Sequence, residues 1–70
     1  MITLQKIDDS RDYNFIYNNV CVAVALLQAD EYYLYFNAGG YDGKVMNLCL
    51  NSLKVLNENL KEGEWKTTGH

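Results

Sequence analysis

The chain has 70 residues, nine of them acidic and six basic, and its net charge at pH 7 is −3. This length suits one domain (1–70) with a small core, and the charge argues against nucleic acid as a partner, because phosphate binding normally needs a basic patch. No run approaches the ~18 apolar residues of a membrane span, so no membrane contact is expected.

The first third of the chain predicts short strands. Residues 2–7 alternate well enough for one strand, and residues 8–12 have the composition of a turn. Tyr13, Phe15 and Tyr17 take every second position, which suits a second strand. The pair at 18–19 then predicts a bulge, a bend or a turn.

The apolar run at residues 20–27 has two interpretations. Three β-branched valines and an aromatic segment at 32–36 that needs an antiparallel neighbour favour a strand. A helix over residues 11–28 is the rival, because Ile16, Val20, Ala23, Val24 and Leu27 also fall at helical spacing.

The strand interpretation makes a β-hairpin that is apolar on both faces. With residues 28–31 as the connection, the expected cross-strand pairs are Leu27 with Tyr32, Ala25 with Leu34, and Ala23 with Phe36. One face leaves room for a helix and holds Cys21, Ala23, Ala25, Leu27, Tyr32, Leu34 and Phe36. The other face has no small residues and holds Val20, Val22, Val24, Leu26, Tyr33 and Tyr35.

The second half of the chain predicts one long helix over residues 43–62. Asp42 is a suitable N-cap, Gly63 is a suitable end, and Leu53 lies at the centre of the apolar stripe. Residues 64–68 suit a fourth strand or a tail, and Trp65 is expected to pack back on the body.

The predicted fold is therefore α+β: a small antiparallel β-sheet of three or four strands with one long C-terminal helix packed on one face. The rival arrangement, also α+β, adds a helix over residues 11–28.

The two cysteines, Cys21 and Cys49, both stand among apolar residues. Residues 1–6 are followed by acids and do not read as a signal peptide, which predicts a cytoplasmic protein with two reduced, buried thiols. A disulfide between Cys21 and Cys49 is the competing interpretation.

Few residues suggest catalysis or ligand binding. His70, the only histidine, is the last residue, and the cysteines form no metal-binding motif, so neither an enzyme nor a metal site is expected. The loop 39–44 precedes a helix as a phosphate loop does, but Ala38 and Val45 replace the glycine and the Ser/Thr of that motif. A capped turn is the better interpretation, and no cofactor is expected.

These features favour a small, non-enzymatic protein-binding module. One helix cannot cover both faces of the hairpin, so the face with Val20, Val22, Val24, Leu26, Tyr33 and Tyr35 is the predicted partner-binding surface. A compact, acidic chain without catalytic residues resembles the accessory inhibitors that phages and mobile elements encode, which implies action on a host or defence complex. The alternatives are a homodimer or other homo-oligomer that buries the same face, and a small nucleotide or anion binder that uses residues 39–44.

Overall fold

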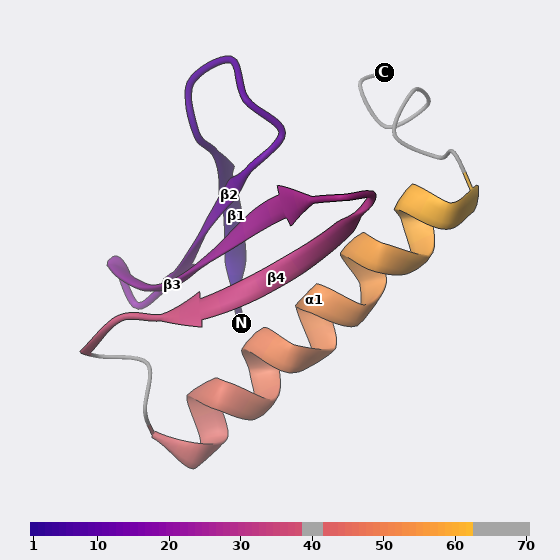
Figure 1. The fold of residues 1–70 in the computed structure, drawn as a ribbon. Coiled ribbons are helices and arrows are strands. Elements are labelled where there is room, and N and C mark those ends of the chain that lie inside the picture. Colours follow the sequence, from indigo (N-terminus) through magenta and orange to yellow (C-terminus); the bar gives the residue numbers. More distant parts are fainter. Residues whose placement is uncertain (39–41, 63–70) are drawn as a thin grey trace.

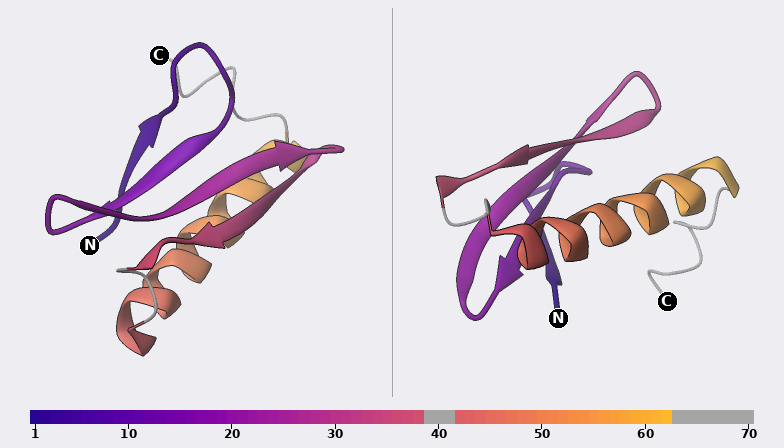
Figure 2. Two further views of the ribbon diagram at one scale, coloured as in Figure 1. Left: turned by 60° about the vertical axis from the view of Figure 1, so that its left-hand side comes forward. Right: turned by 90° about the horizontal axis from the view of Figure 1, so that it is seen from below.

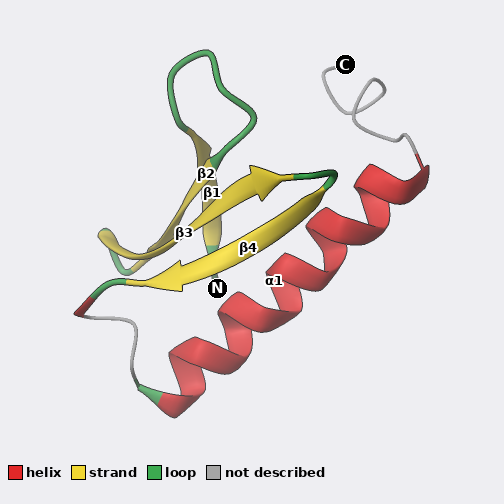
Figure 3. Ribbon diagram, in the orientation of Figure 1, coloured by secondary structure: helices red, strands yellow, loops and turns green. Residues whose placement is uncertain are grey.

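The computed structural model describes residues 1–38 and 42–62 as a four-stranded antiparallel sheet followed by one helix (Figures 1 and 3). The elements are β1 (Thr3–Lys6), β2 (Tyr13–Tyr17), β3 (Val20–Gln28), β4 (Glu31–Phe36) and α1 (Gly43–Glu62). The α+β fold is thus confirmed, and the rival helix over residues 11–28 is wrong because that segment contributes β2 and β3. The predictions for Gly63, Trp65 and residues 64–68 lie outside the described residues.

The strands follow one another across the sheet in chain order, and each pairs antiparallel with the next. Two of the three connections between strands are two-residue turns, at Asn18–Asn19 and Ala29–Asp30, where all four residues have φ between 51° and 68°. These angles are those of a type I′ turn, whose twist matches that of the flanking strands. The predicted pairing of β3 with β4 is confirmed, except that Gln28 also pairs with Glu31 and shortens the expected four-residue connection.

The longer connection between β1 and β2 is hydrogen-bonded to strands β3 and β4. The Asp12 carboxylate accepts a 2.8 Å hydrogen bond from the Leu27 amide of β3, and the Arg11 carbonyl accepts a 2.6 Å bond from the Tyr32 hydroxyl of β4. The Ser10 hydroxyl donates to the Ile7 carbonyl at 2.6 Å. Asp12 therefore holds the loop in place. Its place in a turn predicted from composition suggested only a solvent-exposed acid, whereas the structure gives it a hydrogen bond to β3.

The helix α1 runs alongside β4 and packs on β4 and β3 (Figures 1 and 2). Its N-terminus is capped as predicted, because the Asp42 carboxylate accepts hydrogen bonds from the Lys44 amide at 2.9 Å and the Val45 amide at 3.3 Å. Further along, the Asn57 side chain accepts from the Tyr32 amide at 2.7 Å and donates to the Tyr32 carbonyl at 3.4 Å. Asn57 thus pairs with the outer edge of β4 much as another strand would.

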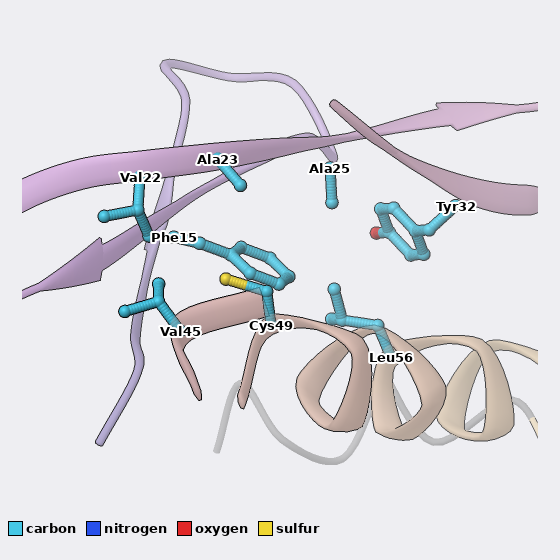
Figure 4. Packing of buried hydrophobic residues seen from close by; sticks show 8 residues of the cluster. All are labelled: Phe15, Val22, Ala23, Ala25, Tyr32, Val45, Cys49 and Leu56. Atoms are coloured by element: carbon cyan, nitrogen blue, oxygen red, sulfur yellow. The ribbon is translucent and has the colours of Figure 1, made fainter. Parts of the chain in front are cut away.

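The core lies between the sheet and α1, and Figure 4 shows its side chains converging from β2, β3, β4 and the helix. Cys49 and Leu56 are fully buried at the centre of the helical stripe, opposite Phe15. Leu53, which we predicted to be that centre, is only half-buried and packs against the edge of the core. The complete set of buried residues is Phe15, Val22, Ala23, Ala25, Tyr32, Val45, Cys49 and Leu56.

A β-bulge in β3 changes which side chains face the helix. Phe15 pairs with Ala23, but the next residue, Ile16, pairs with Cys21, so Val22 is the extra residue opposite no partner. Val22 therefore points into the core beside Val45 and is only 3% exposed (Figure 4). The prediction that Val22 lies on the face away from the helix is wrong.

The bulge also turns the side chains of the two preceding residues, Val20 and Cys21, to the faces opposite to those predicted. Cross-strand partners share a face, so Val20, which pairs with the core-packed Tyr17, lies on the helix side. Cys21, which pairs with Ile16, lies on the opposite side. The predicted faces of both residues are therefore wrong, whereas residues 23–27 and 32–36 face as predicted.

Candidate partner-binding face

The sheet face turned away from α1, which we call the outer face, has no second layer within the described part of the chain. The helix α1 packs on one side of the sheet and leaves the other side uncovered by any described element. The strand pairing places on this face Thr3, Gln5, Asn14, Ile16, Cys21, Val24, Leu26, Gln28, Glu31, Tyr33 and Tyr35.

The part of the outer face formed by β3 and β4 is apolar and partly open to solvent. Tyr33 and Tyr35 are 46% and 47% exposed, while Val24 and Leu26 on the neighbouring strand β3 are half-buried. Val24 lies directly across from Tyr35, and Leu26 lies across from Tyr33. The Tyr35 hydroxyl is 3.5 Å from the Gln28 side-chain oxygen, within reach of a hydrogen bond along the strands. Tyr33 and Tyr35 thus present two half-exposed rings on the same face of β4.

Charged side chains are nearly absent from the outer face. Among the described residues, its one charged residue is Glu31, in β4 next to the turn, and its uncharged polar residues are Thr3, Gln5, Asn14 and Gln28. The acids and bases of the described residues are otherwise in loops, on the far side of β1 and on α1. Scarcity of charge and the presence of tyrosine are compositional features found in the cores of protein interfaces.

The structure brings together four of the six residues predicted for this surface: Val24, Leu26, Tyr33 and Tyr35. Val20 and Val22 belong to the helix side because of the bulge. Seven outer-face residues were not in the predicted surface, and two of them, Ile16 and Cys21, are apolar. The alternation of residues 13–17 could have revealed Ile16, since it stands out of phase with Phe15, but no sequence signal marked Cys21.

The two thiols are free and lie on opposite sides of the sheet. Cys49 is fully buried, and burial raises the pKa of its thiol. Cys21 is half-buried, its Sγ 3.5 Å from the Asn14 side-chain oxygen and 3.4 Å from the Asn37 side-chain nitrogen. A sheet between the two sulfur atoms is incompatible with a disulfide, which needs Cα atoms within about 7 Å and side chains that converge.

A groove of about 420 Å³ lies on the helix side, between the β2–β3 turn and the start of α1. Its lining combines apolar side chains such as Val20 and Val45 with Asp42 and Lys44. The Asp42 carboxylate already accepts from the first helical amides, so it occupies the place an anion would take and adds a negative charge there. The start of α1 therefore gives no support to nucleotide or anion binding, and residues 39–41 of the predicted loop lie outside the described residues.

Within residues 1–38 and 42–62, no three side chains among His, Cys, Asp and Glu gather as a metal site would require. None of the charged side chains described is buried, and no described helix is long and apolar enough to cross a membrane. Comparisons of this chain with protein-family models, with curated proteins and with solved structures found no match.

Proposed function

We propose that this chain is a small, non-enzymatic protein-binding module whose outer face is the contact surface. The single observation that carries the proposal is the exposed, uncharged pair Tyr33 and Tyr35 over the apolar floor of Val24 and Leu26. Tyrosine suits such a role because it buries a large area with little loss of side-chain entropy, and its hydroxyl tolerates water before binding. An inhibitor of a host or defence complex is one form that such a module takes.

The proposal predicts that binding depends on Tyr35 and leaves the fold intact when Tyr35 is changed. Tyr35→Asp places a charge in the apolar part of the outer face, where desolvation would cost binding free energy, yet the side chain is half exposed and is not part of the buried core. Leu50→Asp is the matched control, since Leu50 is 48% exposed on α1, on the other side of the molecule.

Affinity capture from lysates with the parent and both variants tests whether binding depends on Tyr35. Circular dichroism of each protein shows whether it is folded. We expect the same proteins to be captured by the parent and by Leu50→Asp, and to be lost with folded Tyr35→Asp. Equal capture by folded Tyr35→Asp would show that the outer face is not the contact surface.

A further inference from the structure

The two edge strands of the sheet, β1 and β4, are closed to further pairing in different ways. An edge strand presents backbone N–H and C=O groups to other chains, and natural sheets protect such edges by shortness, by charge or by a covering element. β1 has four residues and ends at Lys6, a residue type that discourages strand addition. β4 has six residues and lies beside α1, which is hydrogen-bonded to it through Asn57.

The sequence of β4 makes its edge the more hazardous of the two. Besides Glu31, the strand contains only tyrosine, leucine and phenylalanine. Six-residue segments with high β propensity, little charge and no proline are those that stack into cross-β assemblies. In a symmetric antiparallel pair of two β4 strands, Glu31 of each copy would lie opposite Phe36 of the other, so the two acids would not meet.

Asn57 occupies the place that the backbone of such a strand would take. Its side-chain oxygen accepts a 2.7 Å hydrogen bond from the Tyr32 amide, and its side-chain nitrogen donates to the Tyr32 carbonyl at 3.4 Å. A residue in an antiparallel ladder exchanges the same two bonds with its partner, and the asparagine side chain carries the same donor and acceptor as a peptide group.

We propose that Asn57 keeps β4 from pairing with the β4 strand of a second copy. Because hydrogen-bonding groups alternate along a strand, Leu34 and Phe36 turn theirs to the same edge as Tyr32. A strand that paired along the whole of β4 would therefore have to displace Asn57 from Tyr32. The contact opposes association through the sheet edge, and it is separate from the outer face.

Asn57→Ala tests the proposal, because it removes the side-chain amide while alanine is the better helix former. The direct readout is amide hydrogen exchange of Tyr32, followed by NMR in dilute and in concentrated protein. In dilute solution we expect the Tyr32 amide of the variant to exchange at least about 3-fold faster than in the parent. It should become protected again as the concentration rises, because a second β4 then takes the place of Asn57.

Light scattering on the same samples gives the mass. Asn57→Ala should exceed the chain mass of 8.0 kDa at a concentration at least about tenfold lower than the parent does, since two backbone groups regain partners in each contact. Asn51→Ala makes the same change at an exposed position of α1 and should behave as the parent. Asn57→Ser, whose side chain is too short to reach both Tyr32 groups, replaces Asn57→Ala if circular dichroism shows that variant to be unfolded.

Tyr32→Phe separates the loss of stability from the loss of the edge contact. It removes the hydroxyl that binds the Arg11 carbonyl and leaves the backbone of residue 32 paired with Asn57. Tyr32→Phe should therefore associate no more readily than the parent.

Renewed protection of the Tyr32 amide together with a higher mass, seen in the Asn57 variant and in neither control, supports the proposal. A folded Asn57 variant whose Tyr32 amide exchanges equally fast at every concentration overturns it, and so does a mass that follows the parent's. Equal association of Tyr32→Phe also overturns it, because association would then follow stability alone. The outer face is tested separately by capture with Tyr35→Asp.

Discussion

At the scale of single residues, the Tyr32 hydroxyl is the contact that joins the most distant parts of the sheet. Tyr32 is 3% exposed, and its hydroxyl donates a 2.6 Å bond to the Arg11 carbonyl in the loop that follows β1. Its ring lies 6.1 Å from that of Tyr13, at an angle of 54°. One side chain of β4 thus fixes the loop at the far edge of the sheet.

Replacing Tyr32 by Phe should lower the free energy of unfolding by about 0.5–1.5 kcal/mol, because the ring stays while the hydrogen bond from the hydroxyl to the Arg11 carbonyl is lost. Tyr33→Phe, on the next residue, removes a hydroxyl from a half-exposed ring and should change stability by less than about 0.5 kcal/mol. Urea denaturation of both variants measures the difference. Equal stabilities would mean that water replaces the hydroxyl at Arg11 without cost.

A single extra residue, the bulge at Val22, explains why the predicted outer face was right at four positions and wrong at two. Residues 20–27 are all apolar, so no polar side chain marks where the alternation breaks. One extra residue in a strand turns every side chain on one side of it to the opposite face. The bulge at Val22 arises from pairing with β2, a tertiary contact, and it moved Val20 and Val22 toward the helix and Cys21 away from it.

At the scale of elements, the helix shows how the apolar stripe and the actual core differ. The limits of α1 and its Asp42 cap were predictable, because the cap and the spacing of leucines are local signals. The centre of the stripe was not, because α1 lies along β4 with Asn57 bound to that strand's edge, which rolls Leu56 and Cys49 inward and Leu53 to the side.

We therefore expect Leu56→Ala to lower the free energy of unfolding by about 2–5 kcal/mol, the range for a fully buried leucine. Leu53→Ala should lower it by less. Val55→Ala is the control on the same helix, since Val55 is 54% exposed and should change stability by less than about 0.5 kcal/mol. Thermal and urea unfolding of the three variants gives the order of their stabilities. A larger loss of stability in Leu53→Ala than in Leu56→Ala would contradict the observed packing, in which Leu56 and not Leu53 faces the core.

At the scale of the whole molecule, one layer of helix supports a four-stranded sheet, and the core depends on a few side chains. The fold class followed from the sequence because strand and helix signals lie in separate parts of the chain: residues 13–17 alternate, residues 20–36 are rich in β-branched and aromatic side chains, and residues from 43 repeat at helical spacing. What covers the outer face does not follow, since alternation shows that both faces are apolar and says nothing about a partner.

Two buried protonated groups, Tyr32 and Cys49, should make the stability of the whole molecule fall at alkaline pH. Burial raises the pKa of Tyr32, and nearby Tyr13 raises it further; burial also raises the pKa of Cys49. Ordinary cysteine and tyrosine titrate near pH ~8.5 and ~10. Because both groups hold their protons more tightly when folded, their contribution to stability is complete below those values and is lost as the pH rises through the folded pKa values.

Urea denaturation at pH 7, 9 and 10.5 should therefore show a falling free energy of unfolding, with most of the fall above pH ~9. Tyr32→Phe and Cys49→Ala each remove one titrating group, so each should flatten the pH dependence even though each is less stable than the parent at pH 7. The double variant should show the flattest profile. An unchanged slope in both single variants would mean that groups elsewhere in the chain cause the alkaline loss, because the core would then contain no protonated group whose ionisation opposes folding.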